Sequence, residues 1–301
     1  MPLMLTASDF APLREDPAWM TGALDVVDRA IVAHHHGTVR QGRLVDRVPG
    51  EFEGIRVSLL AGDGLFSGMR VFGNPPHTRA FLLFDGTTRA LLALMDYGVL
   101  NSLRVGATAG VAARYLAPSG AQTVALLGSG WQAPPQLFAL HAALPALQKV
   151  RVYSPTPEHR RAFAEQMTSK LDLPVETCDS AEQAIRDADV VDLCAPGHFD
   201  VREPLFASEW IRPGALLISM AANQYPPGFD REVPLVVDIP EGESSMPLGA
   251  VIVEGLNPRR HPTQSVIYRL EGGTIQDLFV AMWGYHWALE RGLGHAFDLS
   301  A

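Results

Sequence analysis

The sequence predicts an α/β protein that combines a doubly wound parallel sheet with a smaller α+β domain. Strand-like and helix-like segments alternate from residue 121 to about residue 255, which is typical of a parallel sheet with helices on its faces. An apolar strand at 123–127 runs directly into Gly-x-Gly-x-x-Ala at 128–133. Before these residues, four short apolar segments separated by turn residues predict a mostly antiparallel sheet.

The smaller domain is predicted to span residues 1–118. Apolar residues at helical spacing predict a helix over 17–36, and a stretch rich in small residues predicts another over 103–116. Pro118-Ser119-Gly120 marks the domain boundary. The predicted strands between the two helices lie at residues 55–60, 68–72, 80–84 and 90–95.

The parallel-sheet domain is predicted to span residues 119–277. Its predicted strands are 123–127, 150–153, 190–193, 216–220 and 235–237. Its predicted helices are 132–143, 158–171, 181–186 and 206–210. A long amphipathic helix at 274–291 is expected to return to the first domain, which residues from about 278 to 301 would complete.

The glycine-rich turn predicts a site for the pyrophosphate of a dinucleotide. Gly128 allows a tight turn, Gly130 lets the backbone approach the phosphates because it has no Cβ, and Ala133 lets the helix pack against the strand. The helix start also supplies free N–H groups and the positive end of its dipole. The other residues of this loop that we include in the site are Ser129, Trp131 and Gln132.

The end of the second strand favours NADP(H), while NAD stays possible. Proteins that bind NAD usually hold the ribose 2′-OH with a carboxylate there, whereas this chain has Tyr153-Ser154-Pro155-Thr156. The hydroxyls of Ser154 and Thr156 and the charge of Arg160 suit a 2′-phosphate. Arg160 and Arg161 could instead lie on a solvated helix face, and at least one of them is expected to do so.

Composition and charge exclude several classes of protein. The net charge is −9 with no basic patch, which argues against nucleic acid as a partner. No apolar run is long enough to span a membrane, and no signal peptide is recognised. Cys178 and Cys194 are too few for a disulfide framework and fit a cytoplasmic protein. The histidines at 34–36 are adjacent on a predicted helix end and cannot face one ion, so we expect no metal.

Four passages of the chain occur in an order that matches a known family. They are Gly68-Met69-Arg70-Val71; residues 91–96 with Leu103-Arg104-Val105-Gly106-Ala107; residues 127–133; and Gly272-Gly273-Thr274-Ile275-Gln276-Asp277. Over about residues 37–277 the chain resembles the ornithine cyclodeaminase and mu-crystallin family. The resemblance implies a substrate-binding and dimerisation domain, a Rossmann domain, a homodimer and a small amino-acid or imine substrate.

The resemblance also implies roles for individual residues. Arg104 matches an arginine that would hold the substrate carboxylate, for which a planar guanidinium is suited. Arg43 is the candidate for a second, earlier arginine, with Arg40 and Arg56 as alternatives. Each could instead form a surface ion pair, which suits Arg104 least because its neighbours are small and apolar. The nucleotide-binding set also includes Ala195, Met220 and Gly273.

Two departures from the family pattern affect proton transfer. Arg70 stands where the family usually has lysine, and Asn223 stands where it usually has aspartate. Arg70 stays protonated and Asn223 cannot act as a base, so both can hold a substrate but neither can shuttle a proton. The expected catalytic residues are Arg70, Arg104 and Asn223, and Arg70 is also expected to bind substrate.

The expected enzyme is an imine or ketimine reductase or an amino-acid dehydrogenase, and we favour NADP(H)-dependent reduction of a C=N bond. A substrate that is already an iminium needs chiefly hydride and orientation, whereas oxidative deamination must also remove a proton. Two alternatives stay open: an ornithine- or lysine-type cyclodeaminase with bound NAD, and a crystallin-like protein that binds NADP(H) and a ligand without turnover. Asp96, Tyr97 and His77 could supply acid/base chemistry, although turn chemistry is preferred for Asp96 and His77.

Overall fold

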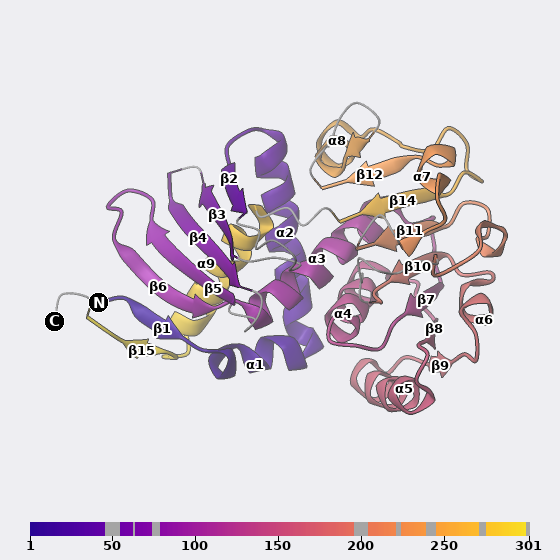
Figure 1. Cartoon of the computed structure of the whole chain (residues 1–301), viewed down its shortest axis with the longest axis horizontal. Coiled ribbons are helices and arrows are strands. Elements are labelled where there is room, and N and C mark those ends of the chain that lie inside the picture. Colours follow the sequence, from indigo (N-terminus) through magenta and orange to yellow (C-terminus); the bar gives the residue numbers. More distant parts are fainter. Residues whose placement is uncertain are drawn as a thin grey trace. The chain divides into compact units, whose positions relative to one another are not determined.

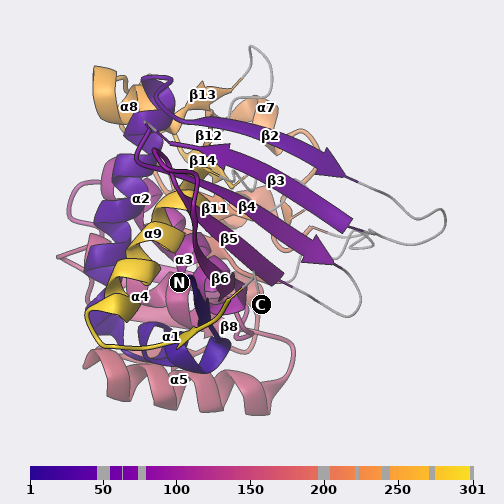
Figure 2. The same cartoon turned by 90° about the vertical axis from the view of Figure 1, so that its left-hand side faces the viewer.

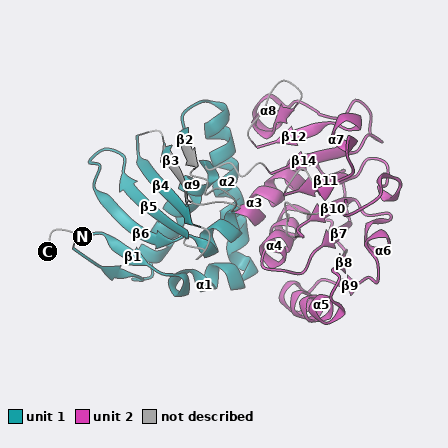
Figure 3. Cartoon of the chain, in the orientation of Figure 1, with its two compact units in different colours: residues 1–104, 273–301 teal, residues 105–272 magenta. Residues whose placement is uncertain are grey.

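The structure is a computed structural model in which the chain divides into two compact units. Unit 1 contains residues 1–104 and 273–301, and unit 2 contains residues 105–272 (Figure 3). The described residues are 1–45, 55–62, 64–73, 79–195, 204–220, 224–238, 245–270 and 275–298.

Unit 1 is built on a mixed sheet with the strand order β15-β1-β6-β5-β4-β3-β2 (Figure 2). The strands β2 to β6 form an antiparallel meander, and β1 joins its edge in parallel with β6. Alternating burial along β4 to β6 shows that one face of the meander packs against the core. The strands are β1 (Leu3–Leu5), β2 (Arg40–Val45), β3 (Ile55–Ala61), β4 (Phe66–Gly73), β5 (Arg79–Asp85), β6 (Leu91–Asp96) and β15 (His295–Ala296).

Helices cover one face of this sheet. The last helix, α9 (Ile275–Leu289), lies against β3, β4 and β5, and α2 (Met20–His35) packs alongside α9 (Figure 2). The two helices approach closely at Gly22, where an added Cβ would already be in van der Waals contact with the Trp283 ring at 3.5 Å. The remaining helical segments are α1 (Ala7–Glu15), the 3₁₀ turn η1 (Pro17–Trp19) and the first part of α3 (Gly98–Leu116).

Unit 2 is built on an all-parallel sheet with the order β13-β12-β14-β11-β10-β7-β8-β9. The strands β7, β10 and β11 are buried along their whole length, as expected for a sheet with helices on both faces. The strands are β7 (Thr123–Leu127), β8 (Lys149–Tyr153), β9 (Val175–Thr177), β10 (Val190–Leu193), β11 (Leu216–Ser219), β12 (Leu235–Val237), β13 (Met246–Pro247) and β14 (Val266–Arg269).

The strand order of unit 2 reverses at β7, and this reversal positions a ligand site. The chain proceeds from β7 to β8 and β9 on one side, and then returns to β10 and β11 on the other. Ligands of doubly wound sheets bind beyond the carboxyl ends of the strands at such a point. Helices α4 and α6 lie on opposite faces of the sheet (Figure 1). The helices are α4 (Ala133–Ala143), α5 (Pro157–Leu171), α6 (Ala181–Ile185), α7 (Phe229–Glu232), α8 (Leu248–Glu254) and the turn η2 (Ser208–Trp210).

The predicted fold class is confirmed, and the differences concern short elements. The sequence did not predict several elements that are short or lack a clear apolar period: β1, β2, β9, β13, β14, β15, α1, α7 and α8. The segment at 206–210 forms only the 3₁₀ turn η2. Among the described residues, no helix has the length and apolar composition needed to cross a bilayer.

The boundary between the units lies inside helix α3, at residues 104 and 105, whereas the sequence analysis placed the domain boundary after that helix. Pro118 and Gly120 follow the end of α3, but they do not indicate which elements this helix packs against. The second half of α3 packs closely against α4. The evidence is at Gly106, where an added Cβ would lie 2.4 Å from the carbonyl oxygen of Pro135.

This close approach predicts a stability effect. Gly106→Ala would push a methyl group into backbone atoms of Pro135, and we expect a loss of about 2 kcal/mol in the free energy of unfolding. Gly284→Ala in α9 is the matched control, since its Cβ would meet side-chain atoms only, with the flexible Leu100 nearest at 3.0 Å. Urea unfolding of both variants measures the difference. Equal stabilities would show that α3 and α4 are not packed as described.

Candidate functional site

A cavity of about 410 Å³ lies in unit 2 at the carboxyl ends of β7 and β8. It is the place that the reversal of strand order predicts for a ligand. Its lining combines the glycine-rich loop with the turn after β8 and the end of β10. The lining residues are Leu127, Gly128, Ser129, Gly130, Tyr153, Ser154, Pro155, Thr156, His159, Ala181, Ala195 and Leu205.

The two glycines of the loop have different structural requirements. Gly128 has a φ of +129°, and a Cβ there would lie 2.9 Å from the backbone nitrogen of Ala195. Gly128 is therefore required both for its backbone conformation and for close packing. A Cβ at Gly130 would meet nothing within 4 Å, so this position is open on the side where a ligand could approach. Ala133 is fully buried at the start of α4.

The turn after β8 is held together by polar contacts. The hydroxyls of Ser129 and Ser154 lie 2.8 Å apart, which joins this turn to the glycine-rich loop. Arg160 is buried; it donates to the Ser154 carbonyl oxygen at 3.1 Å and to Asp179 Oδ1 at 2.6 Å. Arg161 is exposed and pairs with Glu158, as expected for one member of the arginine pair.

The other residues predicted to bind the nucleotide occupy different environments. Ser154, Thr156 and Ala195 line the cavity. Trp131 is 51% exposed, and Gln132 precedes the first residue of α4. Gly273 and Asn223 lie outside the described residues.

Gln224 was missed by sequence reasoning, yet it connects two strand ends at this site. Its Oε1 accepts from the Ser219 hydroxyl at 2.9 Å and from the Met220 backbone N–H at 2.8 Å. Its Nε2 donates to the Ala195 carbonyl oxygen at 2.9 Å. One buried amide thus holds the ends of β10 and β11 together. No spacing in the sequence indicates this role, because its partners come from two separate segments, residues 219–220 and Ala195.

A second group of candidate side chains lies within unit 1 and centres on Asp277. Arg70 on β4 and Arg104 on α3 both form ion pairs with the Asp277 carboxylate, and the Arg104 Nε lies 2.8 Å from Asp277 Oδ1. Tyr97 donates its hydroxyl hydrogen to the same oxygen at 2.7 Å. Arg104 also donates to Asn101 Oδ1 at 2.8 Å. All five side chains are buried.

The electrostatics of this Asp277 cluster favour an anionic ligand. Two guanidiniums share one carboxylate, and each guanidinium carries a permanent charge and several donors in a rigid plane. Arg70 also stacks over the Phe72 ring at 4.6 Å, which orients it. Burial, followed by the charge of Asp277, raises the pKa of Tyr97 well above its usual value, so this hydroxyl remains a donor. Such an arrangement is suited to binding a carboxylate.

The structure places the other candidates of unit 1 as follows. Arg43 lies in β2 opposite Ser58 of β3, and Arg40 begins the same strand. Asp96 Oδ1 accepts from the Gly98 backbone N–H at 3.0 Å, which is a turn contact at the start of α3. His77 lies outside the described residues.

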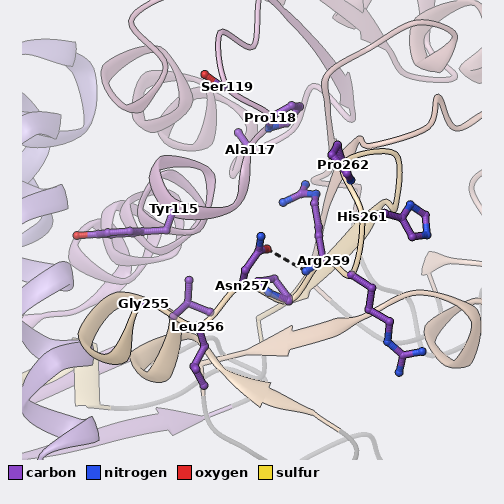
Figure 4. Close-up of a pocket in the computed structure, with 13 residues that line it drawn as sticks. Tyr115, Ala117, Pro118, Ser119, Gly255, Leu256, Asn257, Arg259, His261 and Pro262 are labelled. Atoms are coloured by element: carbon purple, nitrogen blue, oxygen red, sulfur yellow. Dashed lines mark hydrogen bonds between the residues drawn. The ribbon is translucent and has the colours of Figure 1, made fainter.

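A further hollow of about 600 Å³ in unit 2 lies beside the ends of α3 and α8 (Figure 4). Its most buried cation, Arg259, is committed to the local chain, because it donates to the carbonyl oxygens of Gln264 at 3.1 Å and Gly214 at 3.3 Å. The Arg259 backbone N–H donates to Asn257 Oδ1 at 2.9 Å. Arg259 therefore holds this loop together, and we assign no ligand to the hollow. Within the described ranges, no group of His, Cys, Asp and Glu side chains is arranged to hold a metal ion.

Comparison with known proteins identifies the family. The sequence profile of the ornithine cyclodeaminase/mu-crystallin family matches residues 66–239, which include Arg70, Arg104 and the glycine-rich loop. The chain belongs to the ornithine cyclodeaminase/mu-crystallin family. The predicted resemblance is thus confirmed. Asp277 lies beyond the matched residues.

Individual members of the family are similar to this chain. Rat (Rattus norvegicus) ketimine reductase mu-crystallin is 30% identical over 150 residues, which are 50% of this chain but only 45% of the rat protein. The Delta(1)-pyrroline-2-carboxylate reductase of Bacillus cereus is 27% identical over 246 residues, covering 72% of this chain and 73% of that protein. The structure of Thermococcus litoralis Delta(1)-pyrroline-2-carboxylate reductase in complex with NADH and L-proline has a TM-score of 0.82 and 25% identity, and covers 98% of this chain and 100% of that chain.

The open space at Gly130 predicts the effect of filling it. We expect Gly130→Val to abolish measurable nucleotide binding while leaving the melting temperature nearly unchanged, because its side chain would enter the space next to the cavity and not the protein core. Gly128→Ala is the contrasting variant, since its added Cβ would contact backbone atoms and lower the melting temperature. Calorimetric titration with NADPH and thermal unfolding check both effects. Undiminished NADPH binding by Gly130→Val would remove the cavity as the nucleotide site.

Proposed function

We propose that this family member reduces the C=N bond of a small carboxylate-bearing cyclic imine, ketimine or imino acid with NADP(H). The observation that carries the proposal is the pairing of two buried guanidiniums, Arg70 and Arg104, with the one carboxylate of Asp277; we take this cluster as the place where a substrate carboxylate would bind. The glycine-rich loop and its cavity supply a suitable site for the nucleotide. The named activities of the rat and Bacillus cereus relatives agree with this chemistry.

The chain's own residues bind and orient the substrate in this proposal. Arg104 holds the substrate carboxylate through its planar guanidinium, and Arg70 adds a second positive charge. Asp277 and the Tyr97 hydroxyl fix the orientation of both arginines. A bound nicotinamide supplies hydride. A protonated imine that accepts hydride becomes a neutral amine, so this half-reaction needs no proton from a side chain.

The proton inventory of the cluster distinguishes reduction from cyclodeamination. Arg70 remains charged, and the phenol of Tyr97 has a raised pKa, so neither group accepts a proton near neutral pH. The remaining group, the Asp277 carboxylate, is engaged by both arginines and by the Tyr97 hydroxyl. Deamination of an amino acid begins with loss of a proton from the ammonium group. The described cluster therefore favours reduction, and ammonia release from ornithine or lysine by the purified protein would contradict the proposal.

Arg104 provides the direct test of substrate binding. We expect Arg104→Met to raise KM for a carboxylate-bearing cyclic imine by about 10- to 100-fold, because it removes charge-assisted hydrogen bonds. NADPH affinity should stay unchanged, because Arg104 is no part of the cavity that the glycine-rich loop lines. Steady-state kinetics and calorimetric titration measure the two quantities. An unchanged KM would exclude Arg104 from the substrate site.

We also propose a preference for NADPH over NADH and assembly as a homodimer. Ser154, Thr156 and His159 line the cavity at the carboxyl end of β8, where the ribose would bind in this proposal. Arg160 donates a hydrogen bond to the Ser154 carbonyl oxygen. These groups suit a 2′-phosphate, whereas the carboxylate that usually holds the ribose 2′-OH of NAD would repel it. The homodimer follows from family membership, and sedimentation of the purified protein tests it.

The neighbouring arginines allow a matched test of nucleotide preference. We expect Arg160→Met to weaken NADPH binding by about 10-fold with a smaller effect on NADH, because it removes a positive charge next to Ser154. Arg161→Met is the control, since Arg161 is exposed and pairs with Glu158. Dissociation constants for both nucleotides decide the matter. Equal losses for NADPH and NADH, or tighter binding of NADH by the wild type, would contradict the preference.

A further inference from the structure

A fully buried carboxyl group, Asp192, lies inside the sheet of unit 2. It is on β10, in register with Leu126 of β7 and Ile218 of β11, so its side chain shares a face of the sheet with two apolar residues. The side chain that meets it from α4 is Gln136, which is also fully buried. A buried carboxylate without a cation is costly, whereas a buried carboxylic acid is tolerated.

The contacts of Gln136 depend on whether Asp192 carries a proton. One end of the Gln136 amide lies 2.6 Å from both carboxyl oxygens of Asp192, and the other end lies 3.0 Å from Met220 Sδ. When Asp192 is protonated, its hydroxyl can donate to the amide oxygen of Gln136, and the amide nitrogen then donates to Met220 Sδ. If Asp192 is ionised, the amide must reverse so that its nitrogen donates to the carboxylate.

Reversal of the amide changes what faces Met220. The nitrogen that donates to the Met220 sulfur is then replaced by an oxygen, and an acceptor lies against a weak acceptor. The two orientations of the Gln136 amide therefore correspond to the two protonation states of Asp192. Only the protonated state keeps the hydrogen bond between Gln136 and Met220.

Met220 is tied to the cavity through the buried amide of Gln224. The Met220 backbone N–H donates to Gln224 Oε1, and Gln224 Nε2 donates to the carbonyl oxygen of Ala195, which lines the cavity. The Cys194 thiol, next to Ala195, donates to the carbonyl oxygen of Gly128 at 3.5 Å. A chain of contacts thus runs from Asp192 to the ends of the strands that carry the nucleotide site.

We propose that Asp192 is a positioning residue whose proton sets the orientation of the Gln136 amide and, through Met220 and Gln224, the geometry of the nucleotide cavity. The inference rests on the proposed function only in taking this cavity as the site of NADPH. Asp192 does not touch the nucleotide. It acts through the amides that lie between it and the strand ends.

The surroundings of Asp192 agree with a protonated acid. Burial raises its pKa to about 8, with no cation contributing. The facing groups are neutral: Leu126 on β7, Ile218 on β11 and Gln136 on α4. The titratable neighbour is the Cys194 thiol, whose own pKa is raised well above its usual value by burial and then by Asp192.

The sign of the pH effect follows from this shift. Asp192 ionises at about pH 4 in an unfolded chain, so its higher folded pKa adds stability that is complete below about pH 4. That contribution is lost as the pH rises through about 8. The hydrogen bond between Gln136 and Met220 is lost in the same range, so nucleotide affinity should fall there too.

The first measurement follows the proton directly and needs no nucleotide. Carboxyl carbon resonances of protein labelled with ¹³C at aspartate are compared between the wild type and Asp192→Asn as the pH is varied. We expect one resonance, absent from the variant, that titrates near pH 8. A resonance that is already fully ionised at pH 6 would overturn the proposal.

The second measurement follows NADPH and NADH affinity from about pH 6 to pH 10, a range that brackets the Asp192 transition. We expect the wild type to bind both nucleotides about 3- to 10-fold more weakly at the high end of this pH range. NADH serves as a control, because it has no 2′-phosphate whose titration could cause the change. Asp192→Asn should lose this dependence, because its amide donates to Gln136 as the protonated acid does. Gln136→Met should also lose it, with weaker binding throughout.

Asp172→Asn is the matched control, because Asp172 is exposed at the end of α5 with a φ of +49° that asparagine tolerates. Its pH profile should match the wild type. Parallel profiles for the wild type and Asp192→Asn would overturn the link to the cavity and leave the proposed function intact. Failure of either nucleotide to bind at any pH would overturn the proposed function and this link together, whatever the carboxyl titration shows.

Discussion

One half of this protein, unit 1, depends on one carboxylate that two buried arginines share. A guanidinium removed from water needs an anion close by, and Asp277 meets that need for both Arg70 and Arg104. Tyr97 adds a hydrogen bond to the same carboxylate. The Asp277 cluster is therefore pre-organised, and in the proposed function a substrate carboxylate would meet donors whose orientation is already set.

The other half, unit 2, depends on a different constraint, which is the close approach of backbone to backbone. The missing Cβ at Gly128 lets the loop after β7 lie against the end of β10, and Gln224 then joins β10 to β11. Three strand ends are thereby held in one arrangement around the cavity. Family membership explains why both halves occur in one chain, since each lies in a region that the relatives share.

The sequence predicted those parts of the protein that depend on local pattern. The glycine-rich loop was found because its chemistry occupies adjacent positions, and Arg104 was found through its family motif. The sequence predicted no role for Asp277 beyond its place in a family motif, because its partners Arg70 and Tyr97 lie 207 and 180 residues away. Asp192 and Gln224 were missed because a strand residue and an amide show no periodicity that indicates their partners. Asn223 and Gly273 stay predictions.

The division into units affects the order in which the protein can fold during translation. Unit 1 is assembled from both ends of the sequence, with unit 2 inserted between residues 104 and 273. During translation, Arg70 and Arg104 leave the ribosome long before Asp277, while unit 2 is complete and able to fold first. The nascent protein therefore carries both guanidiniums without the Asp277 carboxylate through most of its synthesis, and α9, which packs on the sheet of unit 1, brings that carboxylate last.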